Sequence, residues 1–219
     1  MIHLYAIAGD SLPRRDGLAG IDGAAVEISS VDDLRVVFSR HERGLHVDEN
    51  GVVEHARVID DLTSAGATVL PARLQSDYAD EGALATAVRE RALSLRNALQ
   101  RVAGRVELGV RAAERTTSER AAGADDPAAY MRARLADAQR LDQVVAAIHE
   151  PLAALSDDSV RHVVTIGGFK MSSAYLVKKE TLDDFRSVFD TIVSEHPDLA
   201  LVCTGPWPPY SFVAARGRE

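Results

Sequence analysis

Few residues in this chain have types and spacings that could carry chemistry. His41 and His46 lie five residues apart around Gly44, with acidic residues close by, and such a pair could ligate a metal ion. Two dispersed histidines among surface acids are a weak signal, however, and a solvated loop accounts for them as well. We favour the solvated loop and predict neither a metal nor a cofactor.

The remaining single candidates fit structural roles better than catalytic ones. His55 follows Glu54 on an expected helix and faces the side of Val52 and Ile59, where a lone histidine is usually a packing residue. Cys203 lies within an apolar strand, in which a thiol is as a rule inert. The serines lack a nucleophile-elbow context, and no glycine-rich nucleotide-binding pattern occurs.

Paired carboxylates are the last group that could support acid–base chemistry. They stand mostly at expected helix starts or on exposed faces, where acidic side chains cap helices and interact with the helix dipole. Examples of such pairs are Asp32-Asp33, Asp60-Asp61, Asp157-Asp158 and Asp183-Asp184. The sequence therefore supplies no catalytic constellation.

Composition and charge narrow the function classes. The chain has 219 residues, with 25 Lys and Arg against 33 Asp and Glu, so its formal charge is 25 − 33 = −8, which argues against nucleic-acid binding. A single cysteine excludes an intrachain disulfide. No stretch approaches the roughly 20 apolar residues that span a bilayer, and the N-terminus lacks the cationic start of a secretory signal. We predict a cytosolic-type protein without a membrane span.

The N-terminal half of the chain is rich in expected strands. Apolar runs, turn signals and helical spacing predict the order β-β-β-α-β-α-β, which indicates an α+β fold. We expect an N-terminal ferredoxin-like domain with an extra strand over residues 1–115. Its elements are strands at Ile2–Ala8, Ala24–Ser29, Leu34–Arg40, Thr68–Leu70 and Arg105–Arg111, and helices at Val52–Leu62 and Asp80–Val102.

A small, polar stretch at residues 116–126 predicts a linker to a C-terminal α+β domain at residues 127–219. A long helix opens it, because Asp126-Pro127 is a good helix start. Two strands joined by Gly167-Gly168, a helix from Thr181 and a strand at Leu199–Thr204 follow. The long helix carries a narrow apolar stripe that could form an intermolecular coil, although we favour packing within the chain: Met131, Leu135, Ala138, Leu141, Val145, Ile148 and Leu152.

Two proline-containing segments, residues 67–73 and 203–213, have compositions that the local rules for helices, strands and turns do not require. Between Pro206 and Phe212 lie three prolines, the only tryptophan, Trp207, and a tyrosine. Because proline fixes φ, this segment is stiff and loses little entropy on ordering. It fits either an internal strut or a binding edge.

These and other segments together resemble the gas vesicle protein family GvpF/GvpL. The resemblance extends along nearly the whole chain, and its last block is the most specific because it is rich in rare residues. The chain departs from the family at 74–76, where Leu-Gln-Ser replaces the common Phe-Gly-Thr. The matching segments are Leu4-Tyr5-Ala6-Ile7, Gly20-Ile21-Asp22-Gly23, Glu54-His55-Ala56, Val69-Leu70-Pro71-Ala72-Arg73, Ala174-Tyr175-Leu176-Val177 and Thr204–Val213.

The resemblance implies an accessory or minor protein of gas vesicle assembly without enzymatic activity. It implies binding to the small, hydrophobic main shell protein, contact with other gas vesicle accessory proteins, and a place in the cytoplasm and at the gas-facing side of the vesicle. We expect a sheet edge or apolar groove in residues 1–115 to receive the shell subunit. The residues that we assign to protein binding are Pro71, Arg73, Trp207, Pro208, Pro209, Tyr210 and Phe212.

Two alternatives from other classes remain open. One is a small-molecule enzyme or sensor on a ferredoxin-like scaffold, for which His41, His46 and His55 are the only raw material. The other is a self-assembling structural protein that uses the stripe from Met131 to Leu152 as a seam.

Overall fold

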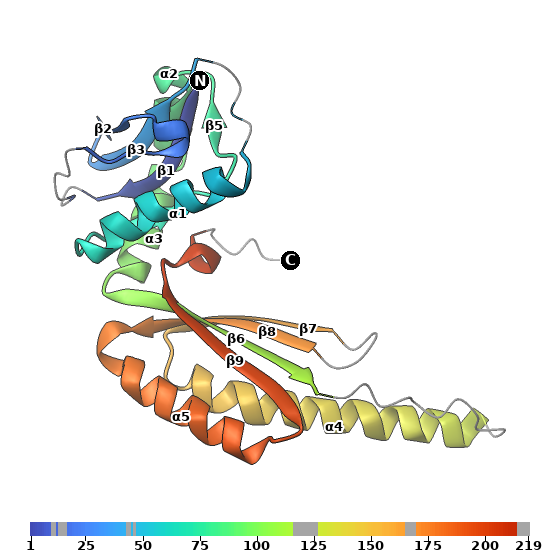
Figure 1. The fold of residues 1–219 in the computed structure, drawn as a ribbon. Coiled ribbons are helices and arrows are strands. Elements are labelled where there is room, and N and C mark those ends of the chain that lie inside the picture. The colour runs from blue at the N-terminus through green and yellow to red at the C-terminus, as the bar shows by residue number, and fades with distance from the viewer. Residues whose placement is uncertain are drawn as a thin grey trace. The chain divides into compact units, whose positions relative to one another are not determined.

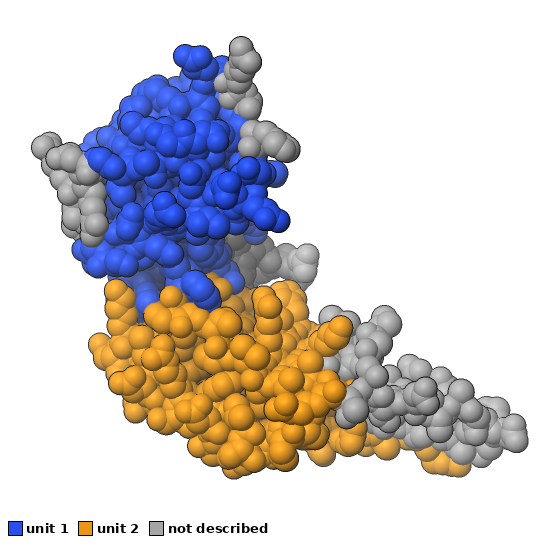
Figure 2. Space-filling model, viewed as in Figure 1, with its two compact units in different colours: residues 1–106, 207–219 blue, residues 107–206 orange. Residues whose placement is uncertain are grey.

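The computed structural model describes residues 1–9, 12, 17–42, 45, 47–115, 127–164 and 170–213. The chain divides into two compact units, shown in Figure 2: unit 1 is Met1–Val106 with Trp207–Glu219, and unit 2 is Glu107–Pro206. This division differs from the expected boundaries in two places, since residues 107–115 fall in unit 2 and the C-terminal segment falls in unit 1. The expected linker at 116–126 and the turn at Gly167-Gly168 lie outside the described residues.

The sheet of unit 1 is antiparallel and is built around its first strand. The strand order is β2-β3-β1-β4, and β5 also pairs with β1 (Figure 1). All seven residues of β1 are buried, as an apolar run bounded by turns predicts for a central strand. The strands are β1 (Ile2–Ala8), β2 (Val26–Val31), β3 (Leu34–Arg40), β4 (Val69–Pro71) and β5 (Asp77–Tyr78).

Two short strands share one side of β1. Ala6–Ala8 pairs with β4, whereas Ile2–His3 pairs with β5. The segment between β4 and β5 stays attached to β1 because the backbone N–H of Ala72 donates to the Tyr5 carbonyl at 2.8 Å and that of Leu4 donates to the Ser76 carbonyl at 3.0 Å.

Helices cover both faces of this sheet. The first, α1 (Glu49–Ser64), is capped by Asp48 and packs Val58, Ile59 and Leu62 against Tyr5 and Val37. The opposite face carries Arg40, which forms an ion pair with Glu81 of the next helix. The expected helix at Asp80–Val102 is two helices, α2 (Glu81–Glu90) and α3 (Ala92–Val102). Arg91 separates them because its φ of −108° and ψ of 8° interrupt the helical ladder.

The expected place of the strand at Arg105–Arg111 in the first domain requires a correction. β6 (Arg105–Glu114) lies in the second sheet, because its buried face, Leu108, Val110 and Ala112, completes the core of unit 2. The fifth strand of the first sheet is instead β5, whose two residues are too short for a sequence pattern to reveal. Between β1 and β2, the described residues contain one 3-10 turn, η1 (Ile21–Gly23), and no α-helix. The ferredoxin-like label stays a prediction.

Unit 2 is a second antiparallel sheet with helices on one face. Its strand order is β7-β8-β6-β9, and Figure 1 shows α4 and α5 together on the same side of it. Tyr175, Phe185 and Ile148 lie at the centre of the core between sheet and helices. The elements are α4 (Pro127–Ala153), β7 (Asp158–Val164), β8 (Lys170–Lys178), η2 (Lys179–Thr181), α5 (Leu182–Glu195) and β9 (Leu199–Trp207), followed by η3 (Tyr210–Phe212), which belongs to unit 1.

The apolar stripe of α4 packs within its own chain over only part of its length. Val145, Ile148 and Leu152 are buried in the core of unit 2, whereas Met131 and Leu135 are 65% and 60% exposed. Among the described residues, none of the helices combines the length and apolar character that crossing a membrane requires.

Candidate functional site

The aromatic segment Trp207–Phe212 divides into buried and exposed side chains. Phe212 is 1% exposed, and Pro208 and Pro209 are buried as well. Trp207 and Tyr210 are 49% and 39% exposed. Three residues of the segment are therefore buried anchors, and two aromatic rings are exposed.

Hydrogen bonds hold this segment in one conformation. The backbone N–H of Tyr210 donates to the Pro208 carbonyl at 2.8 Å, and that of Phe212 donates to the Pro209 carbonyl at 3.1 Å. The guanidinium of Arg101, on α3, donates to the Phe212 carbonyl. Residues 207–213 are thereby attached to a helix of unit 1 that lies more than a hundred positions earlier in the sequence, which the sequence itself does not indicate.

The other two residues assigned to protein binding lie at the end of β4. Pro71 is buried and pairs with Ala6 of β1, and Arg73, two residues later, is exposed. Pro71 therefore has a structural place in the sheet, whereas Arg73 can reach a partner. All seven residues assigned to protein binding belong to unit 1.

A buried polar network in unit 1 joins β1, β5 and α1. His3 Nδ1 lies 2.6 Å from Asp77 Oδ1, and His3 Nε2 lies 2.9 Å from His55 Nδ1. His55 Nε2 lies 3.1 Å from the carbonyl oxygen of Ala72. His3 and His55 are 0% and 4% exposed, so every ring nitrogen of this buried pair has a partner from the protein.

The partners fix which nitrogens carry protons. A carbonyl only accepts, so His55 Nε2 donates to Ala72. Burial lowers the pKa of His55 to about 4, so its ring is neutral at pH 7 and its Nδ1 accepts a proton from His3 Nε2. His3 Nδ1 lies at hydrogen-bond distance from the Asp77 carboxylate, so His3 links His55 to β5.

A second branch of the network surrounds Tyr5. Its hydroxyl accepts from the backbone N–H of Ile21 at 2.9 Å and lies 2.8 Å from Ser39 Oγ, which in turn lies 2.8 Å from His41 Nε2. Burial raises the pKa of Tyr5 and lowers that of His41. The backbone N–H of Asp22 donates to Glu54 at 3.0 Å, which ties η1 to α1.

These contacts connect four of the six segments on which the family resemblance rests. The strand with Tyr5, the turn at residues 20–23, the Glu54-His55 pair and Ala72 after β4 meet in this one network. The expectation that His55 is a satisfied packing residue is confirmed, although its expected neighbour Val52 is 47% exposed. His3 and Asp77 were not among the residues singled out from the sequence. The feature that could have identified His3 is a histidine inside an otherwise apolar strand, because a buried polar ring requires hydrogen-bond partners.

The ring nitrogens of His3 and His55 and the hydroxyl of Tyr5 are bonded to neighbouring residues, so the network can fix η1, α1 and β5 against β1. In the part of the chain that the structure describes, no three or more His, Cys, Asp or Glu side chains are placed to hold a metal ion. His46 lies outside that part. Cys203 is partly buried, and burial raises the pKa of its thiol.

Comparisons with known sequences and structures agree on one protein family. The sequence model of the family described as gas vesicle synthesis protein GvpL/GvpF matches residues 1–214. Gas vesicle protein F2 of Halobacterium salinarum is 28% identical over 216 residues, which cover 97% of this chain and 91% of the relative. Gas vesicle protein L of a Streptomyces species is 29% identical over 190 residues, covering 75% of this chain and 71% of that protein.

Solved structures show the same fold. The crystal structure of GvpF from Anabaena sp. PCC7120 superposes with a TM-score of 0.84 at 18% identity and covers 100% of this chain and 98% of its own. That of GvpF from Microcystis aeruginosa gives a TM-score of 0.80 at 16% identity, covering 98% and 99%. The fold, the family match and the conjunction of the matching segments agree, and the chain belongs to the GvpL/GvpF family of gas vesicle synthesis proteins.

Proposed function

We propose that this chain takes part in gas vesicle formation by binding the hydrophobic main shell protein and limiting its aggregation before assembly. Family membership implies the role in gas vesicle formation. The observation that carries the binding step is the pair of exposed aromatic rings, Trp207 and Tyr210, on a segment that buried Pro208, Pro209 and Phe212 anchor.

The physical problem explains why such a partner is needed. A shell that excludes water requires subunits with large apolar faces, and such faces aggregate unless they are covered. This chain carries a formal charge of −8, and an acidic partner bound to an apolar subunit keeps the complex dispersed through charge repulsion.

Trp207 and Tyr210 are suited to this contact for two reasons. Tryptophan and tyrosine are enriched among the residues that dominate binding energy at protein interfaces. Their support by buried Pro208, Pro209 and Phe212 fixes the backbone before binding, so little conformational entropy is lost when the partner arrives. We include Arg73 as an exposed polar residue at the rim and treat Pro71 as its structural support.

The edge of the first sheet is the second surface that we assign to the shell subunit. β2 ends the strand order, and its outer side is covered at Val26, whose N–H donates to the Leu18 carbonyl at 3.0 Å. Farther along, Ile28 is 38% exposed. A sheet edge with an apolar side chain supports addition of an extended segment as a further strand.

The rest of the proposal concerns location and the absence of catalysis. We place the protein at the gas-facing surface of the vesicle, where exposed aromatic rings suit contact with apolar shell faces. We assign it no enzymatic activity, because the polar groups of His3, His55 and Tyr5 are satisfied within the protein. An enzyme or sensor would need such groups to converge on a cavity.

Pull-down by the full-length chain tests the proposal. The tagged chain is co-expressed with the main shell protein, and the shell protein retained by the tag is quantified. We expect the double variant with Trp207→Ala and Tyr210→Ala to retain at least tenfold less shell protein than the unmodified chain. Leu93→Ala is the matched control, because Leu93 is a 72% exposed apolar residue of the same unit. Equal retention of the shell protein by the double variant and the control would show that the aromatic pair does not bind it.

A further inference from the structure

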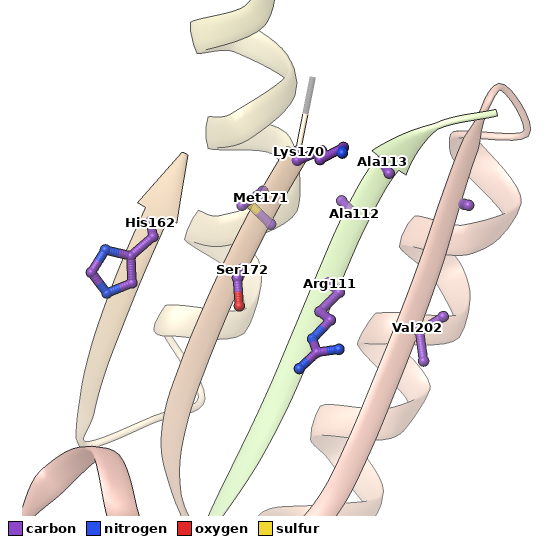
Figure 3. Close-up of a pocket in the computed structure, with 9 residues that line it drawn as sticks. Arg111, Ala112, Ala113, His162, Lys170, Met171, Ser172 and Val202 are labelled. Atoms are coloured by element: carbon purple, nitrogen blue, oxygen red, sulfur yellow. The ribbon is translucent and has the colours of Figure 1, made fainter. Parts of the chain in front are cut away.

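Among the described residues of unit 2, helices cover only one face of the second sheet. α4 and α5 cover the face that carries the core of unit 2. On the opposite face lies a hollow of about 400 Å³, built from all four strands of the sheet. Figure 3 shows Arg111, Ser172 and Val202 projecting on this side, with the helices behind the strands.

Strand alternation places a particular set of residues on this face. In β9, Leu201 and Cys203 pack in the core, so Ala200 and Val202 point to the other side. His162 of β7 lies opposite Ser172 of β8, which puts both on the same face. The two-residue alternation of the strands therefore points one set of side chains into the core and the next set into the hollow.

Small side chains make the face shallow and accessible. Ala113, Ser172 and Ala200 come from three neighbouring strands and leave space above the backbone, and Val202 beside them is 52% exposed. A sheet face is buried when a second layer of secondary structure packs on it, as α4 and α5 do on the other face. The free face therefore has room and apolar surface for another helix.

The charged residues that line this hollow are basic, in contrast to the net charge of the chain. Arg111, Lys170 and His162 line the hollow, and no Asp or Glu is among its lining residues. In the described residues, neither Arg111 nor Lys170 forms an ion pair. A local basic group in a chain of charge −8 favours an acidic partner.

We propose that this face docks an amphipathic helix of a partner protein, with Asp or Glu beside small apolar residues. The small residues would lie over Ala113 and Ala200, and the carboxylates would meet Arg111 and Lys170. This interaction is separate from the contact between unit 1 and the shell subunit, so failure of either leaves the other to be tested independently.

The test uses the full chain and two alanine-rich peptides of about 20 residues, which is longer than the roughly 12–15 residues below which isolated helices are marginal in water. One peptide carries glutamates along one face, and its twin carries lysines at the same positions. Backbone amide NMR shifts report binding. We expect the Glu peptide to move the amides of Ala113, Ser172 and Ala200 and to bind at least tenfold more tightly than the Lys peptide.

Charge reversal supplies the matched comparison. Arg111→Glu should weaken binding of the Glu peptide at least tenfold, and Lys170→Glu is a second charge-reversal variant for which we expect the same result. Arg161→Glu makes the same change on β7, but its position alternates with that of His162, so it lies on the opposite face and should leave binding unchanged.

Three outcomes would overturn the proposal. The first is equal binding of the two peptides, and the second is equal loss of binding with Arg161→Glu. The third concerns a second copy of the chain as occupant. Light scattering that shows a dimer which Arg111→Glu dissociates would assign the face to self-association instead. A monomer whose site amides respond only to the Glu peptide supports the partner helix.

Discussion

The imidazole of His3, in the central strand of the first sheet, lies 2.9 Å from the imidazole of His55 on the helix packed over it. The rings meet edge to face, with centroids 5.1 Å apart. Because His3 also contacts Asp77 and His55 also donates to the Ala72 carbonyl, this bond joins strand, helix and β5 in one hydrogen-bonded network. Unit 1, which carries the proposed shell contact, depends on it.

Stability should fall as the medium becomes acidic. The pKa of His55 is 6.5 in the absence of the fold and about 4 within it, because burial disfavours the charged ring. Between these values the unfolded chain binds a proton that the folded chain does not, so the free energy of unfolding decreases as the pH drops from 6.5 to 4. The total loss is about 3 kcal/mol. Urea denaturation across this range measures it.

The variant His55→Gln should flatten that pH dependence, whereas His162→Gln, at an exposed position of unit 2, should preserve it. Burial also lowers the pKa of His41 and His149, so these residues contribute a remaining slope of the same sign. An unchanged slope in His55→Gln would show that this residue is not the main titrating group.

A methyl group at Gly20 should destabilise unit 1. The added Cβ would overlap the Tyr5 hydroxyl and approach its Cζ to 2.7 Å. Tyr5 cannot move aside, because Ser39 and Ile21 hold its hydroxyl. Gly20→Ala should cost about 1–3 kcal/mol. Gly9→Ala is the control, since a Cβ there meets no atom within 4 Å, and thermal melting compares the two.

The two kinds of aromatic residue in the C-terminal segment should behave oppositely. Phe212 is fully buried, so Phe212→Ala should lower the free energy of unfolding by about 3–5 kcal/mol. Trp207 is half exposed, so Trp207→Ala should change stability by only about 0.5 kcal/mol while reducing shell binding. Denaturation curves of both variants test this. A large stability loss in Trp207→Ala would make the residue a strut.

Cys203 should react slowly while the chain is folded. Burial raises the pKa of its thiol, so less thiolate is present at pH 8 than in a free cysteine, and the side chain is also partly shielded. We expect alkylation by iodoacetamide to be several-fold faster in urea than in buffer. Equal rates would indicate that β9 exposes this side chain.

The sequence predicted those elements whose signals are local. β1 and β3 begin and end at the expected residues, because a buried apolar run or an alternating segment bounded by turn residues defines each of them. The long helix starts at Pro127 as its capping pattern predicts.

What the sequence did not reveal depends on contacts between distant residues. Strand β6 has the pattern of any half-buried strand, and only its partners place it in the second sheet. His3 reaches His55 and Asp77 across 52 and 74 positions, and no spacing rule within one sequence relates them. Arg101 and Phe212 are 111 positions apart. Such pairs follow from topology rather than from periodicity.

The most direct measurement is co-expression of this chain with the main gas vesicle shell protein, followed by size exclusion of the soluble fraction. The account predicts that the shell protein becomes soluble and elutes together with this chain in one peak. A shell protein that stays insoluble, while this chain elutes alone, would contradict the proposal that this chain shields it.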